Sequence, residues 1–183
     1  MRGWFGWLLA GLLLLPSSVM AAEIRHADHI WQDDDRLLVR VYLDVVLPDV
    51  LVEALANGIE VTLFSEVRLE YARGILGERL VKEREKSVRI RYYALSRHYV
   101  VTDPDRQRVE LAPTLGDALE LLAERLGRVV LDIGRERLRP DVDYTLSARV
   151  KLDHAALPLP LQWDARLRGA YVTQLGWYRW PLR

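Results

Sequence analysis

The sequence contains no cysteine among its 183 residues. This absence excludes disulfide bonds, a lipid-modified cysteine, thiolate catalysis, and zinc or iron–sulfur clusters held by cysteine. A domain of roughly 160 residues can nevertheless fold without crosslinks, because it buries about 70% of the surface that its unfolded chain exposes. The fold must therefore rest on its hydrophobic core.

A net charge and long hydrophobic runs are also missing. The 26 Lys and Arg residues balance 26 Asp and Glu residues, which gives no reason to expect nucleic acid as a partner. The apolar stretch over residues 4–15 is about a dozen residues long, short of the roughly 20 that cross a bilayer as a helix. Repeats, low-complexity tracts and Gly/Ser linkers are absent, so we expect one β-rich domain over residues 22–183.

The amino terminus has the three-part pattern of a secretory signal peptide. Arg2 supplies a cationic start, residues 4–15 an apolar core, and Pro16 a helix break before the small residues that end at Ala21. We predict a signal peptide over residues 1–21, cleaved after Ala21 or Ala22. The domain is then periplasmic and spans no membrane after cleavage; an uncleaved anchor is the alternative.

Alternating apolar and polar residues predict several half-buried antiparallel strands. The pattern runs over residues 37–47, 59–71, 87–101, 108–112, 144–153 and 172–180. Two helices are expected between them, over residues 48–56 and, after the N-cap Thr114, up to Gly127. This content predicts a mainly β protein, an antiparallel β-sandwich with one or two helical insertions. An α+β fold with the second helix on one sheet face is the alternative.

Catalytic and metal-binding patterns are weak. His26 and His29 lie near three consecutive aspartates at 33–35, but residues three apart in a strand point to opposite faces, so a solvated surface is the better interpretation. Ser96 and His98 share a strand face by alternation, yet nothing marks an orienting acid or an oxyanion site. We predict no enzyme activity, no cofactor and no metal.

Two surfaces stand out as candidates for ligand or partner binding. The odd-numbered face of the third predicted strand carries Arg89, Arg91, Tyr93, Arg97 and Tyr99. Guanidinium groups and rings of this kind can hold a phosphate, a carboxylate or a glycan. The alternative is an ordinary solvated sheet face that pairs with Glu60, Glu66 and Glu70 across strands.

The second surface is the aromatic carboxy-terminal edge, with Trp177 and Trp180. Alternation sends Trp180 and Tyr178 to one face of the last strand and Trp177 to the other. Such rings can bind a partner, although aromatic residues in a closing strand more often seal a core.

Several stretches taken in order resemble the DUF4390 family of exported proteobacterial proteins. They are residues 54–59 (ALANGI), 91–99 (RYYALSRHY), the helix start at 114–119, and 152–153 followed by 157–160 (LPLP). One departure is visible at residues 71–76, where members often carry a tryptophan-rich patch. The resemblance implies an exported protein often encoded beside a sensor kinase and its response regulator, and it supplies no catalytic residue.

These observations lead to three hypotheses. The first is a non-enzymatic periplasmic interaction module for envelope signalling, whose partner is an envelope or inner-membrane protein such as a sensor kinase. The second is a domain that binds a glycan or an anionic headgroup through Arg89, Arg91, Tyr93 and Arg97. The third is an envelope hydrolase.

Overall fold

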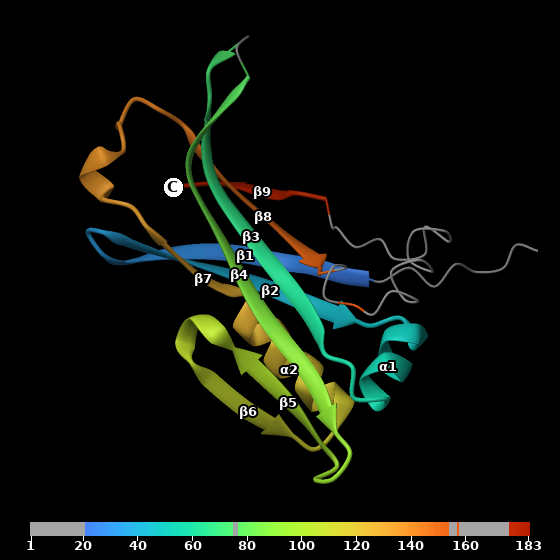
Figure 1. Cartoon of the computed structure of the whole chain (residues 1–183). Helices are drawn as coiled ribbons and strands as arrows, with labels where there is room; N and C mark the ends of the chain where they lie inside the picture. Colours follow the sequence, from blue (N-terminus) through green and yellow to red (C-terminus); the bar gives the residue numbers. More distant parts are fainter. Residues whose placement is uncertain (1–20, 75–76, 154–156, 158–175) are drawn as a thin grey trace, which may run out of the picture.

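Two antiparallel sheets face each other in the structure, a computed structural model that describes residues 21–74, 77–153, 157 and 176–183 (Figure 1). The smaller sheet has the order β1-β2-β7, formed by Ala21–Asp33, Arg36–Val46 and Arg128–Asp132. The larger sheet has the order β6-β5-β4-β3-β8-β9. Its strands are Arg108–Ala112, His98–Asp103, Glu78–Tyr93, Val61–Ala72, Tyr144–Leu152 and Tyr178–Pro181, in that order across the sheet.

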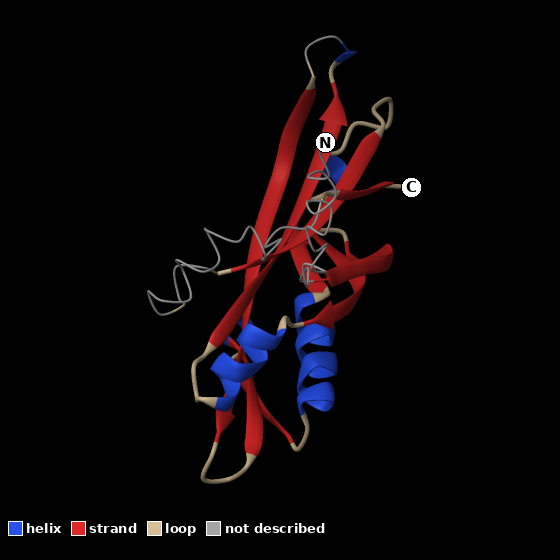
Figure 2. Ribbon diagram, turned by 90° about the vertical axis from the view of Figure 1, so that its right-hand side faces the viewer, coloured by secondary structure: helices blue, strands red, loops and turns tan. Residues whose placement is uncertain are grey.

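Two α-helices and two short 3-10 helices, Pro104–Arg106 and Arg135–Arg137, complete the described part of the chain. Helix α1 spans Asp49–Ala56, between β2 and β3, and helix α2 spans Leu115–Leu126, between β6 and β7. The side chain of Thr114 caps α2 by accepting a hydrogen bond from the backbone N–H of Asp117 at 3.1 Å. Figure 2 shows α2 below the smaller sheet, on the same side of the larger one. The smaller sheet and α2 thus form one layer against the larger sheet.

The hydrophobic core divides into two clusters along the larger sheet. One lies under the helices, where Leu122 and Leu126 of α2 pack against Leu63 of β3 and Ile90 of β4, all fully buried. The other lies between the two sheets, where Leu37 and Val39 of β2 pack with Leu69 and Leu146 of the larger sheet. Apolar burial on this scale is the main stabilising contribution in a domain of this size.

Lys86 of β4 points inward, with the parity of Val88 and Ile90, and is only 4% exposed. Its Nζ atom donates to the carbonyl oxygens of Arg125 at 2.7 Å and Arg128 at 3.3 Å, and lies 2.8 Å from Oδ2 of Asp103. Burial lowers the pKa of Lys86, and the Asp103 carboxylate works against that shift. The side chain therefore joins β4, β5 and the carboxyl end of α2.

The structure confirms the predicted mainly β sandwich with helical insertions. It corrects the third strand, because the predicted strand over residues 87–101 is a hairpin in which β4 ends at Tyr93 and β5 begins at His98. The turn between them brings Arg97 to a positive φ of 54°. The last predicted strand is shorter where it is described, over Tyr178–Pro181, and residues 172–175 lie outside the described part.

Strands β1 and β7 are additions that the alternation did not predict. Strand β1 pairs with β2 from its first residue, since Ala21 lies opposite Val46. The predicted signal peptide, apart from Ala21, lies outside the described residues. Within the described ranges, no helix has the length and apolar character needed to cross a membrane.

Candidate functional site

The outer face of the larger sheet carries most of the predicted arginine surface. Arg89, Arg91 and Tyr93 of β4 alternate with core residues and therefore point away from the helices. On the neighbouring strands, Arg91 lies opposite Val100, which in turn lies opposite Leu111, and Thr102 lies opposite Val109. We call this surface the arginine–apolar face, defined by Arg89, Arg91, Tyr93, Val100, Val109 and Leu111.

Three large apolar side chains on this face are exposed. Leu111 is 65% exposed, Val109 62% and Tyr93 46%. Beyond the face, Leu95 at the tip of the β4–β5 hairpin is fully exposed. Single exposed apolar residues are ordinary on a protein surface, but neighbouring ones on adjacent strands are typical of interaction sites.

The arginines of this face lack strong acidic partners. Arg91 donates from Nε to the carbonyl oxygen of Gly58 at 3.0 Å, and its Cζ atom lies 5.1 Å from the centre of the Tyr93 ring. Arg89 reaches Oε1 of Glu60 only at 3.6 Å. Among the described residues no carboxylate pairs with Arg91 or Arg97. The face is therefore apolar and cationic at once.

The hairpin separates two of the predicted site residues from this face. Tyr99 contacts the ring of Tyr92 at 4.9 Å between centroids and packs against the core under the helices. Arg97 lies in the turn. The turn reverses the parity of the outward-facing residues: odd-numbered residues point outward in β4, whereas even-numbered residues point outward in β5. The prediction that Tyr99 shares a face with Arg89 is wrong for this reason.

A dense ion-pair network covers the same outer face farther along the sheet. Glu66 of β3 is 2% exposed and accepts hydrogen bonds from Nε and Nη2 of Arg149 at 2.8 and 2.7 Å. Lys151 lies 3.2 Å from the same carboxylate. Burial raises the pKa of Glu66, but the hydrogen bonds that Arg149 and Lys151 donate to its carboxylate outweigh it, and the pKa falls to about 2.

The two tryptophans of the predicted aromatic edge lie apart, as the alternation predicted. Trp177 packs on the outer face, where the Cζ atoms of Arg68 and Arg149 lie 4.4 and 4.3 Å from its ring centre. Trp180 packs with Tyr178 against the core between the sheets and donates from Nε1 to His29 at 3.4 Å. Both rings are half-buried. Trp180 therefore helps to close the sandwich, whereas Trp177 lies against the arginines of the outer face.

The weak catalytic patterns do not assemble into a site. His26 stacks on Tyr42 with 5.8 Å between ring centres, whereas His29 contacts Trp180 and the carbonyl oxygen of Arg183. The backbone of Ser96 contacts Nδ1 of His98, and its hydroxyl donates to the carbonyl of Tyr93. Within the described ranges, no three His, Asp or Glu side chains lie close enough to hold a metal ion.

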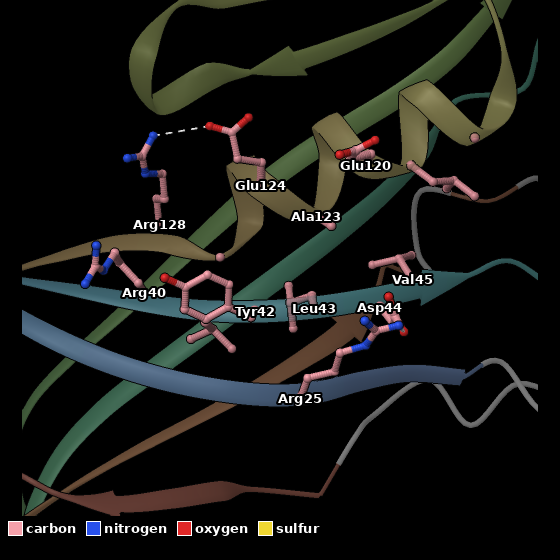
Figure 3. Close-up of a pocket in the computed structure, with 14 residues that line it drawn as sticks. Arg25, Arg40, Tyr42, Leu43, Asp44, Val45, Glu120, Ala123, Glu124 and Arg128 are labelled. Atoms are coloured by element: carbon pink, nitrogen blue, oxygen red, sulfur yellow. Dashed lines mark hydrogen bonds and ion pairs between the residues drawn. The ribbon is translucent and has the colours of Figure 1, made fainter.

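A groove that sequence reasoning did not find runs between β2 and α2 (Figure 3). It has a volume of about 790 Å³. Val41, Leu43 and Val45 of β2 line one side, and Gly116, Leu119 and Ala123 of α2 line the other. Charged side chains surround it: Arg25, Arg40, Asp44, Glu120, Glu124 and Arg128. The groove depends on two elements about 75 residues apart, and no local motif signals it.

Comparisons with known proteins give one match. The family model described as a domain of unknown function, DUF4390, matches residues 21–181. No curated protein and no solved structure matches the chain.

Proposed function

The chain belongs to the DUF4390 family, and we propose that it is an exported, non-enzymatic module that docks an envelope protein through the arginine–apolar face. The exposed side chains of Tyr93, Val109 and Leu111 next to Arg91 carry this proposal. Interfaces are enriched in aromatic residues and arginine, and a few such side chains dominate their binding energy.

The chemistry of the face defines its partner. Burying the three apolar side chains favours association, and Arg91 gains most from a carboxylate that it lacks within the described part of the chain. The partner should therefore present apolar side chains beside Asp or Glu. The signal-peptide pattern at residues 1–21 supports a periplasmic location. A sensor kinase whose extracytoplasmic part lies in the periplasm is one partner that the chain could reach there.

In vivo photo-crosslinking tests this proposal. A photoreactive amino acid at Leu111 should crosslink one envelope protein, and the same probe at Ile30, which is 51% exposed on β1, should not. The captured protein is then purified, and its affinity for the chain is measured directly. We expect Leu111→Glu and Arg91→Glu to weaken binding at least about tenfold, because replacing a hot-spot residue costs about 2 kcal/mol or more and about 1.4 kcal/mol corresponds to a factor of ten. Ile30→Glu should leave binding unchanged.

Other results would replace the proposal. Binding to vesicles containing phosphatidylglycerol that falls with Arg91→Glu, without a crosslinked protein, would favour a headgroup-binding domain. Turnover of an envelope substrate by the purified protein would show that it is an enzyme. Equal crosslinking from Leu111 and Ile30 would remove the arginine–apolar face as the docking site.

A further inference from the structure

Strand β2 is paired with β7 along only half of its length. The two strands pair from Arg36 opposite Asp132 to Arg40 opposite Arg128, and β2 then continues to Val46. The last bond on this side runs from the N–H of Val41 to the carbonyl oxygen of Gly127, at 2.7 Å. Beyond it, in the part of the chain that the structure describes, no strand or turn pairs with this edge over residues 42–46.

The free edge presents backbone groups to the groove. Residues two apart in a strand point their N–H and C=O groups to the same side. Because Val41 bonds on the groove side, Leu43 and Val45 also direct theirs toward it. Strand β2 has no bulge in this stretch, since the irregularities of the β1–β2 pair place their extra residues in β1.

The opposite wall carries small side chains, which leave the groove open beside the edge of β2. Gly116 and Ala123 are the small residues of α2 that line the groove. Ala123 is labelled in Figure 3. A Cβ atom built on Gly116 meets only the Thr114 hydroxyl oxygen, at 3.8 Å, within a 4 Å radius. The apolar side chains of Leu43, Val45 and Leu119 supply a surface for alternate side chains of an occupant.

Charge around the groove is balanced with one exception. Arg25 pairs with Asp44, Arg40 with Asp28 at 2.6 Å, and Arg128 with Glu124 at 3.2 Å. Glu120 lines the groove, and within the described ranges it has no ion pair. A basic side chain on an occupant would complement this carboxylate.

We propose that the groove binds an extended peptide segment of a partner protein, which adds to the edge of β2 as a strand. The segment pairs with the N–H and C=O groups of Leu43 and Val45, alternates apolar side chains, and places a Lys or Arg near Glu120. This site differs from the arginine–apolar face, because it lies in the layer of β2 and α2, whereas that face is the outer side of the larger sheet.

Peptide selection tests the proposal without a known partner. A random dodecapeptide library displayed on phage is selected on the purified protein, and enriched sequences are synthesised. We expect alternating apolar residues with at least one Lys or Arg. Binding of such a peptide, followed by hydrogen exchange, should slow exchange at the amides of Leu43 and Val45.

Two variants examine the wall that α2 forms. Gly116→Leu places a large side chain in the groove and should weaken peptide binding at least about tenfold. The protein should stay folded by circular dichroism, because there is space around a Cβ atom at this position. Glu120→Lys should weaken binding about three- to tenfold, and the matched change Glu53→Lys on the exposed surface of α1 should not. Leu111→Glu should leave peptide binding unchanged, which separates this site from the arginine–apolar face.

Several results would overturn the proposal. They are a selection that enriches no peptide, binding that survives Gly116→Leu, and unchanged exchange at Leu43 and Val45 in the bound state. Binding that depends on Leu111 rather than Gly116 would also overturn it, because the peptide would then occupy the other surface.

Discussion

Replacing Lys86 with Met should destabilise the fold strongly, although Lys86 lies in the charged run over residues 82–86. The variant keeps the length of the side chain and removes the ammonium group. Asp103, which is 1% exposed, then loses its cation, and the carbonyl oxygens of Arg125 and Arg128 lose their donor. Breaking a buried pair by removing one partner costs about 3–5 kcal/mol, and this is the loss we expect in the free energy of unfolding.

Urea unfolding followed by circular dichroism measures this loss. The double variant Lys86→Met/Asp103→Asn should recover about 2 kcal/mol, because it removes the unpaired charge. An asparagine at 103 still offers Oδ1 to the N–H of Arg106, which the carboxylate now contacts at 3.4 Å. Lys82→Met, on the same strand but without a buried ion pair, should change stability by less than about 0.5 kcal/mol.

Two results would refute this reasoning. A loss below about 1 kcal/mol for Lys86→Met would show that the ammonium adds little beyond its apolar stem. Strictly additive effects of Lys86→Met and Asp103→Asn would show that the two groups do not interact.

Three further predictions concern other parts of the fold. The carboxylate of Glu66 stabilises the fold, because its pKa of about 2 in the folded protein lies below the ordinary value of 4.5. This stabilisation is present above pH 4.5 and is lost as pH falls toward 2. Glu66→Gln should remove about 1–2 kcal/mol of this pH dependence, measured in acid titrations of stability, after allowance for solvent screening. Gly127→Ala should lower the free energy of unfolding, measured in urea, by about 3 kcal/mol or more, because its Cβ would clash with the carbonyl oxygen of Val41. Trp177→Ala should lower the free energy of unfolding, measured by thermal unfolding, by about 1–2 kcal/mol, because the guanidinium groups of Arg68 and Arg149 lose their cation–π contacts with the indole ring.

Much of the fold could be predicted because a strand that buries one face has apolar and polar residues in alternation. Strands β2, β3 and β8 each bury one face, and alternation predicted all three. Alternation did not predict β1, because the bulge at Arg25 switches its inward residues from Ile24 to Ala27 and Trp31. The same parity placed Lys86 with Val88 and Ile90, so alternation, rather than residue type, was the signal for its burial.

The candidate sites were only partly predictable. Alternation within β4 correctly placed Arg89, Arg91 and Tyr93 on one face. It failed beyond Tyr93, because the turn before His98 contains no Gly or Pro to mark it. Leu111 joins the face only through the pairing of β5 with β6, and the groove exists only because α2 packs beside β2. Such long-range contacts leave no local pattern.

The buried lysine also links stability to the proposed peptide groove. Lys86 donates to the carbonyl oxygen of Arg125 in the last turn of α2 and to that of Arg128 at the start of β7. Helix α2 forms one wall of that groove. Lys86→Met removes the hydrogen bond that holds the carboxyl end of α2. Under conditions where circular dichroism shows that this variant is folded, its affinity for the peptide should fall about three- to tenfold. Docking through the arginine–apolar face should stay unchanged, since β4, β5 and β6 keep their own ladder. Unchanged peptide affinity would mean that Leu122 and Leu126, buried in the core, position α2 without the lysine.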